Sequence, residues 1–224
     1  MGLMRRRSST LCYAGPSCWT YLTCGLRLTG LGKLAIGARF LHYEETMNPK
    51  YIIRNETHAD VTAITEVTIA AFKTLEISNH TEQSIIEALR AAKALTVSLV
   101  AEMNGQVVGH IAFSPLSISD GTPNWFGLGP VSVLPQHQRK GIGKALIENG
   151  LEDLKKMNAR GCCLVGHPNY YRKFGFKNVS GLVYEGVPQE VFFALSFDGH
   201  TPQGTVDFHE GFKAGAQTEL HPTP

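Results

Sequence analysis

The residues with the clearest chemical meaning lie at 138–144, where two glycines stand among basic side chains and read Gln138-Arg139-Lys140-Gly141-Ile142-Gly143-Lys144. Val131 and Val133 alternate with smaller residues before this segment, and apolar residues at helical spacing follow it, which predicts a strand, a loop and a helix. A helix N-terminus offers free N–H groups and a partial positive charge, and glycine lets a phosphate approach the backbone. The segment therefore predicts a pyrophosphate-binding loop.

The spacing of the glycines excludes two common phosphate-binding motifs. A P-loop has four residues between its first glycine and a Gly-Lys pair, and the dinucleotide fingerprint has a third glycine three residues after the second. Here Lys144 directly follows Gly143, and Leu146 stands where the third glycine would be. Turn formation alone is the alternative for a Gly-x-Gly pair, but the basic residues around it favour an anion site.

The pattern Gln/Arg-x-x-Gly-x-Gly/Ala in this loop resembles the acetyl-CoA loop of the GNAT superfamily of N-acetyltransferases. The resemblance implies an α/β (α+β) fold, in which helices flank a central, mixed and mostly antiparallel sheet with one splayed pair of strands. It implies acetyl-CoA as the acyl-donor substrate, with residues 131–133 lining the pantetheine arm and supplying the oxyanion N–H. The implied cofactor-binding residues are Val131, Ser132, Val133, Gln138, Arg139, Lys140, Gly141, Ile142, Gly143, Lys144 and Asn169.

A second informative run reads Gly166-His167-Pro168-Asn169-Tyr170-Tyr171-Arg172-Lys173-Phe174-Gly175-Phe176. It resembles a run that is common in the YhbS-like subgroup of predicted acetyltransferases, with His167 where Asp is usual. The superfamily typically carries a Tyr four residues before a Gly-Phe pair, so the resemblance implies that Tyr171 is the general acid for the departing CoA thiolate. The alternative is that Tyr170 and Tyr171 are both packing aromatics.

The general base is not identified by the residues. The stretch 125–134 holds no carboxylate, and the available groups are Glu102, His110, His167 or a water molecule. Each side chain also has a purely structural interpretation: Glu102 as a solvated hairpin residue, His110 as a half-buried histidine and His167 as a loop residue before proline. A non-catalytic acyl-CoA-binding module is therefore a rival to the enzyme, as is a transferase that uses a longer acyl group or a hydroxyl acceptor.

Direct attack of a primary amine on the thioester is the expected reaction. Cys162 and Cys163 lie in an apolar run that reads as a buried strand, which disfavours a covalent route through a cysteine. The acceptor partner is expected to be a small-molecule or protein amine, and the protein a monomer or homodimer. Trp125 and Phe126 suggest an apolar or aromatic lining on the acceptor side.

The order of predicted elements agrees with this fold. Asn104-Gly105 is a strong signal for a tight hairpin turn, and Gly161 is expected to break the chain after the glycine-loop helix. Helices are expected from about 57 and 81. Strands are expected at 51–54, 95–102, 106–118, 125–134 and 162–166, with closing strands near 183–184, 188–195 and 204–208. The resemblance covers about residues 50–213.

Length and charge suggest one domain with an appendage. The chain has 224 residues, 43% of them apolar, which suffices for a sizeable core. Residues 1–47 carry a net charge of +4 and the remainder −2, and this mildly acidic body argues against a nucleic-acid partner. The expected parts are an N-terminal extension at 1–47, a GNAT domain at 48–213 and a flexible tail at 214–224. The extension is disordered, transit-like, or absent from a native product that starts at Met47.

Metal and membrane partners are not expected. The nine His residues form no recognisable ligand set, and Cys12, Cys18 and Cys24 lack the Cys-x-x-Cys spacing of a zinc site. Basic residues interrupt the apolar stretches of the first 47 residues, which makes them a poor transmembrane helix. The cysteine usage favours a reducing compartment and so a cytoplasmic protein, or an organellar one if residues 1–47 are a transit peptide.

Overall fold

The computed structural model describes residues 51–73, 75 and 78–214. The expectations for residues 1–47, including their three cysteines, and for nearly all of the tail at 214–224 lie outside these residues. Within the described ranges, no helix has both the length and the apolar character needed to cross a bilayer.

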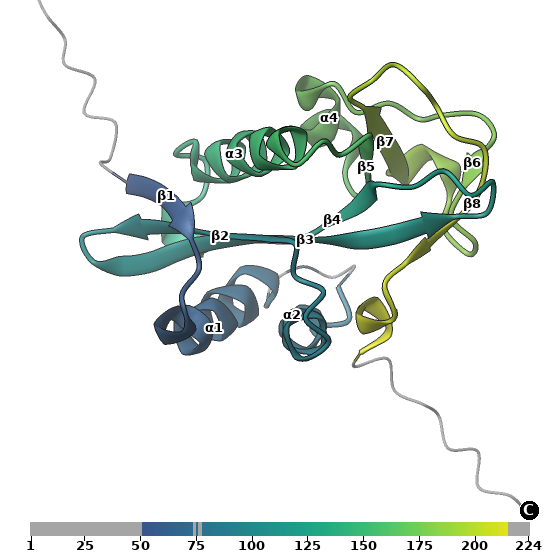
Figure 1. The fold of residues 1–224 in the computed structure, drawn as a ribbon. Helices are drawn as coiled ribbons and strands as arrows, with labels where there is room; N and C mark the ends of the chain where they lie inside the picture. The colour runs from purple at the N-terminus through teal and green to yellow at the C-terminus, as the bar shows by residue number, and fades with distance from the viewer. Residues whose placement is uncertain (1–50, 74, 76–77, 215–224) are drawn as a thin grey trace, which may run out of the picture. The chain divides into compact units, whose positions relative to one another are not determined.

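An eight-stranded sheet forms the centre of the fold, with the order β1-β2-β3-β4-β5-β7 and with β8 joining β3 and β6 (Figure 1). The strands are β1 (Tyr51–Asn55), β2 (Val97–Met103), β3 (Gln106–Ile118), β4 (Trp125–Val133), β5 (Gly161–Val165), β6 (Leu182–Val183), β7 (Phe192–Ser196) and β8 (Gly204–Phe208). All neighbours are antiparallel except β4 with β5 and β6 with β8. The sequence-based fold class is therefore confirmed.

The β2–β3 hairpin turns at Asn104 and Gly105, whose φ angles of 52° and 77° suit a tight two-residue turn. This confirms the turn read from the Asn-Gly pair. Strand β2 begins at Val97, two residues later than expected. Strand β7 begins at Phe192, four residues later than expected, because Gln189–Val191 form a 3-10 helix, whereas β6 and β8 lie within one residue of their expected places.

Strand β4 leaves β5 soon after the two meet. Their parallel pairing covers three residues of each strand and ends with Gly127 opposite Cys163. Beyond that point β4 has one residue more than β3 between the pairs Leu128–Phe113 and Val131–Ile111, which is a β-bulge. The expected splayed pair is thus β4 and β5, and the bulge containing Gly129 and Pro130 lies where the two strands separate.

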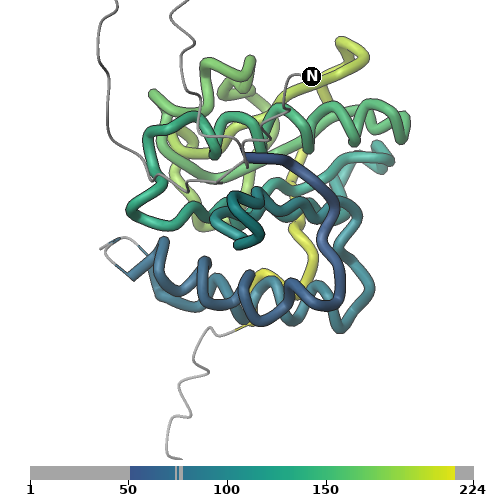
Figure 2. Tube along the Cα trace, turned by 90° about the vertical axis from the view of Figure 1, so that its left-hand side faces the viewer, coloured from purple at the N-terminus to yellow at the C-terminus, as the bar shows by residue number. Residues whose placement is uncertain are grey.

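Helices cover both faces of the sheet. Helix α3 (Ile142–Lys156) packs on one face, and α1 (Val61–Phe72) and α2 (Glu82–Ala91) pack on the other, as the side view in Figure 2 also shows. The α3 face holds the larger apolar core, which includes Leu99, Ile111, Phe113, Leu146 and Phe193. The C-terminal segment, yellow in Figure 2, runs from β8 to a short 3-10 helix (Glu210–Lys213) beside α2.

The break after α3 differs from the sequence-based expectation. The helix ends at Lys156, and Asn158 takes the left-handed conformation with φ 57°. Gly161 is instead the first residue of β5, where a Cβ would lie 2.4 Å from the ring of Trp125. Asparagine tolerates the left-handed region, so it makes the turn, while glycine provides space for the indole.

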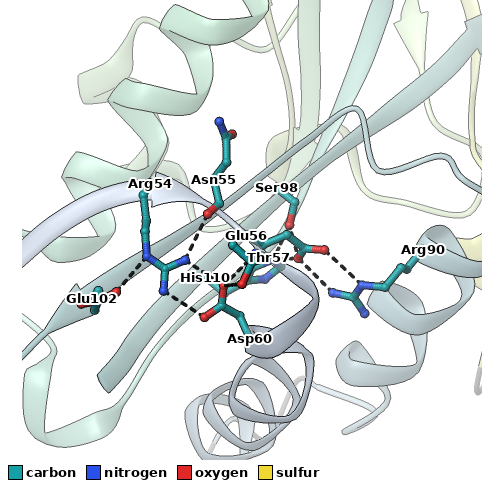
Figure 3. A network of polar contacts seen from close by, with 9 residues as sticks. All are labelled: Arg54, Asn55, Glu56, Thr57, Asp60, Arg90, Ser98, Glu102 and His110. Atoms are coloured by element: carbon teal, nitrogen blue, oxygen red, sulfur yellow. Dashed lines mark hydrogen bonds and ion pairs between the residues drawn. The ribbon is translucent and has the colours of Figure 1, made fainter. Parts of the chain in front are cut away.

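A network of ionic and polar groups connects β1, β2 and β3 to the two helices below the sheet (Figure 3). Arg54 donates to both oxygens of Asp60, at 2.7 and 2.9 Å, and to Glu102 at 2.8 Å. Asp60 also accepts a hydrogen bond from the backbone N–H of Thr57, which completes a capping box before α1. These groups satisfy one another, so the network is structural.

Glu56 is the centre of the second half of this network. It accepts two hydrogen bonds from Arg90 of α2, at 3.1 and 2.9 Å, and one from the hydroxyl of Ser98. His110 is fully buried, and its Nε2 lies 2.8 Å from Ser98 Oγ and 3.6 Å from Glu56 Oε2. Burial would raise the pKa of Glu56, but its interactions with His110, Arg90 and Ser98 outweigh burial and lower the pKa to about 2.

The depressed pKa of Glu56 predicts acid lability. In the unfolded chain Glu56 takes up a proton near its ordinary pKa of 4.5, whereas in the folded chain it does so near 2. Its stabilisation is therefore present above pH 4.5 and is lost as the pH falls towards 2, by roughly 3 kcal/mol in total. Glu56→Gln should lower the free energy of unfolding at neutral pH and flatten its fall below pH 4.5, as measured by urea titrations at a series of pH values. Glu87→Gln, an exposed change on α2, is the control, and identical pH profiles for the two variants would contradict the assignment.

Candidate functional site

A cavity of about 580 Å³ lies at the N-terminal end of α3 and is called the loop cavity below. Its lining combines the glycine loop with β4 and the segment after β5, through Val131, Val133, Gln138, Arg139, Gly141, Gly143, Lys144, Tyr170, Tyr171 and Lys173. Gly141 precedes the helix with φ 84°, in the left-handed conformation that favours glycine. The first-turn N–H groups of α3 and three cationic side chains thus meet at one cavity, an arrangement suited to phosphate groups.

The backbone of β4 adds hydrogen-bonding groups to this cavity. The N–H of Leu134 donates to the carbonyl of Val108 at 2.9 Å, so this group points towards β3. Backbone polar groups alternate between the two sides of a strand, so those of Ser132 also face β3, while those of Val131 and Val133 face the β5 side. The carbonyl of Val133 accepts a hydrogen bond from Gln138 at 3.0 Å on that side. Since β5 pairs with β4 no further than Gly127, the N–H groups of Val131 and Val133 open into the gap.

A second cavity of about 580 Å³, called the α2 cavity below, lies where α1 and α2 approach β4. Most of its described lining is apolar or aromatic, including Phe72, Ile85, Leu128, Tyr184, Phe208 and Phe212. Glu82 is the one carboxylate among the described lining residues, and no Lys or Arg is among them. This cavity therefore suits a molecule with an apolar body and a limited number of polar groups.

Three residues, Val131, Tyr170 and Tyr171, line both cavities. The two tyrosines come from α4 (Pro168–Tyr171), which follows β5 directly. Their rings meet edge to face at 5.1 Å between centroids, and the ring of Tyr171 lies against Gly166, where it leaves no space for a Cβ. Burial raises the pKa of both phenols above the ordinary value, so both remain protonated at neutral pH.

The structure brings most of the predicted site residues together. Tyr171 and seven of the predicted cofactor-binding residues line the loop cavity, namely Val131, Val133, Gln138, Arg139, Gly141, Gly143 and Lys144. Ser132 points to the opposite face, where its buried hydroxyl lies 3.2 Å from that of Thr68 on α1. Ile142 is buried in the core, and Lys140 and Asn169 are exposed and absent from the cavity lining.

Of the three side chains weighed as a base, one lines a cavity. Glu102 is paired with Arg54, and His110 is buried in the Glu56 network, so neither reaches the two cavities. His167 does line the α2 cavity, but its Nδ1 accepts the N–H of Asn169 at 3.3 Å. The neutral ring then carries its proton on Nε2, which leaves that nitrogen as a donor in this geometry.

Trp125 and Phe126, which were expected to give the acceptor side an aromatic lining, line neither cavity. Trp125 is 1% exposed and covers Gly161, and Phe126 packs against the core. The aromatic lining comes instead from Tyr184, Phe208 and Phe212, which reach the cavity from segments distant in sequence. Neither Lys173 nor Glu82 was identified as a site residue from the sequence. For Lys173 the preceding Tyr170-Tyr171 pair was a usable signal. The sequence around Glu82 is that of any acidic residue in the first turn of a helix.

The chemistry of this arrangement follows from its groups. One cavity can hold a phosphate-bearing molecule, the backbone of β4 can bind the arm of that molecule, and two protonated phenols lie where it would meet a second molecule. Cys162 and Cys163 are fully buried and burial raises both thiol pKa values, which makes either a poor nucleophile. Among residues 51–73, 75 and 78–214, no cluster of three or more His, Cys, Asp or Glu side chains could hold a metal ion.

Comparisons with known proteins agree with this chemistry. A GNAT family acetyltransferase from Brucella melitensis, solved in complex with acetyl-CoA, is 49% identical; the match covers 73% of this chain and 99% of that one, with a TM-score of 0.66. The Escherichia coli protein YhbS, solved in complex with CoA, is 26% identical over 74% of this chain and 93% of that one, with a TM-score of 0.68. A curated uncharacterized N-acetyltransferase YhbS of Escherichia coli K12 is 29% identical over 127 residues, 56% of this chain and 73% of its own length. The family model described as "Acetyltransferase (GNAT) domain" matches residues 52–179, and this chain therefore belongs to the GNAT acetyltransferases.

Proposed function

We propose that this protein is an acetyl-CoA-dependent N-acetyltransferase that passes the acetyl group directly to a primary amine. The observation that carries the proposal is the common boundary of the two cavities at Val131, Tyr170 and Tyr171. A donor in the loop cavity and an acceptor in the α2 cavity would meet at that boundary. Membership of the family and the relatives solved with acetyl-CoA or CoA support this choice of donor.

Donor binding would use three sets of groups. The pyrophosphate lies at the first turn of α3, where Arg139, Lys144 and Lys173 line the same cavity. The pantetheine arm runs along β4 and takes a hydrogen bond from the N–H of Val133. The thioester then lies near Val131, whose N–H is the group best placed to stabilise the oxyanion that forms at its carbonyl.

The reaction proceeds by a single transfer. The amine nitrogen attacks the thioester carbonyl, the C–S bond breaks, and the thiolate takes the proton of Tyr171 while the amine loses a proton. Both Tyr170 and Tyr171 border the two cavities with phenols that are protonated at neutral pH. Tyr171 is our choice of acid because it stands four residues before the Gly175-Phe176 pair, where the family typically carries a Tyr. The Nδ1 atom of His167 already accepts a hydrogen bond from the backbone N–H of Asn169. We therefore assign removal of the proton from the amine to a water molecule in the α2 cavity.

The rival function is a module that binds acetyl-CoA without turnover. Its support is that none of the basic groups expected from the sequence lies at the cavity boundary with a free acceptor nitrogen or oxygen. Both functions require donor binding, and they differ in amine-dependent release of CoA. A panel of amines with a no-amine control separates them.

Gly143→Glu should abolish acetyl-CoA binding. The new carboxylate would repel the phosphates, and even a Cβ at this position would lie 2.8 Å from the hydroxyl of Tyr170. Titration calorimetry with CoA checks this. Asn149→Glu adds the same charge to an exposed position on the same helix outside the cavity and should leave the affinity within about threefold of the original. Equal affinities for the two variants would refute the donor site.

Tyr171→Phe should lower kcat by about 100-fold or more, because the leaving thiolate loses its acid, while CoA affinity stays nearly unchanged. The neighbouring substitution Tyr170→Phe is the matched control and should cost less than about tenfold. Steady-state rates of CoA release with a saturating amine measure both. A larger loss in Tyr170→Phe would transfer the role of the acid to Tyr170, and unchanged rates in both would exclude phenol acid catalysis.

A further inference from the structure

The α2 cavity combines a mainly apolar lining with a single carboxylate among its described residues. Its described walls are built mainly from aromatic and aliphatic side chains, among them Tyr184, Phe208 and Phe212, whose rings form a continuous series with centroids 4.8 and 5.0 Å apart. Into these walls the first residue of α2, Glu82, brings a single carboxylate. The cationic residues Arg139, Lys144 and Lys173 line the other cavity. The α2 cavity thus carries one negative group that no described lining residue neutralises.

The two oxygens of Glu82 differ in their surroundings. Oε1 accepts a hydrogen bond from the hydroxyl of Ser78, just before the helix. Oε2 is buried from solvent and has no hydrogen-bond partner among the described residues. A buried carboxylate oxygen without a donor is costly. A turn of the Glu82 carboxyl group towards the cavity would bring Oε2 to a cationic N–H donor there and remove that cost.

We propose that Glu82 binds the ammonium group of the acceptor, and that the acceptor is a primary amine with a single positive charge, an apolar body of aromatic size and no carboxylate. This inference rests on the proposed function in calling the amine an acceptor, but binding of the amine to Glu82 does not itself require turnover. An amine is a cation at neutral pH, so the pair with Glu82 selects the form that is present in solution. Loss of the proton to water follows binding.

The walls of the cavity define the rest of the acceptor. A volume of about 580 Å³ lies within the range of small-molecule sites, and the Tyr184–Phe208–Phe212 series offers ring faces and edges to an aromatic group. An amino acid would place its carboxylate near Glu82 without a Lys or Arg from the described lining to pair with it. A polyamine would leave additional cations among apolar walls, where an unpaired charge is strongly disfavoured.

The test compares amines that differ by one charge. The probes are 2-phenylethylamine, L-phenylalanine, which adds a carboxylate to the same skeleton, and spermidine, which adds cations without an aromatic body. Binding of each to the CoA-saturated protein is measured by calorimetry, and acetylation of each is measured in parallel. The variants are Glu82→Gln, which keeps an oxygen for Ser78 but removes the charge, Glu82→Asp, and Glu87→Gln, which removes an exposed charge from the same helix.

The expected result is a preference for 2-phenylethylamine over both other probes by at least about tenfold in Kd. Glu82→Gln should weaken the binding of 2-phenylethylamine by about 10- to 100-fold, the usual range for a hydrogen bond between charged groups. The same substitution should bring the Kd values of 2-phenylethylamine and L-phenylalanine closer together. Glu82→Asp should restore part of the affinity, and Glu87→Gln should change nothing.

Two results would overturn the inference while leaving the enzyme intact. One is equal binding of 2-phenylethylamine by the original protein and Glu82→Gln. The other is acetylation of L-phenylalanine or spermidine in preference to the aromatic amine. Conversely, Glu82-dependent binding of 2-phenylethylamine without acetylation of any amine would support the recognition role of Glu82 and refute the proposed transferase function.

Discussion

The early end of the pairing between β4 and β5 is the constraint on which the rest of the structure depends. A strand inside a sheet has backbone groups that need partners, and β4 loses those on one side after Gly127. The bulge at Gly129–Pro130 turns the strand away, while β7 holds β5 by five antiparallel pairs. The gap so formed exposes the N–H groups of Val131 and Val133 and provides the space in which the tyrosines of α4 and the first turn of α3 meet. Continued pairing of β4 with β5 would supply the missing backbone hydrogen bonds, but it would remove the boundary that the two cavities share.

Much of the fold could be predicted from short-range rules. The Asn104-Gly105 turn, the glycine before α3 and the alternation along β4 are local features with local causes, so their structures follow from sequence. The prediction that Ser132 binds the cofactor together with Val131 and Val133 overlooked one local rule. Side chains alternate along a strand, so three consecutive residues cannot all face the same cavity. Trp125 and Gly161 are a different case, since a glycine between a helix and a strand signals a break whether it makes the turn or provides space for a ring from another strand.

The candidate site shows the limit of residue type as a guide to role. Glu102 and His110 have suitable side chains for catalysis, yet their partners Arg54, Ser98 and Glu56 come from elements that only the tertiary fold brings near. Glu82 presents the reverse case, because its sequence context is that of any acidic residue in the first turn of a helix. Its place at a cavity depends on how α2 packs against β4, which no local pattern encodes.

Tyr170 has a consequence for how the two sites communicate. Its hydroxyl lies over Gly143 at the start of α3, the ammonium of Lys173 lies 4.0 Å from the centre of its ring, and the same ring borders the α2 cavity. Phosphates at the glycine loop would compete with this ring for Lys173, and any resulting shift of the ring would change the shape of the α2 cavity. Thermodynamic linkage then makes the coupling reciprocal: whatever factor the donor contributes to amine affinity, the amine contributes to donor affinity. Two ligands coupled in this way would bind as a linked pair, and neither affinity would be a property of one cavity alone.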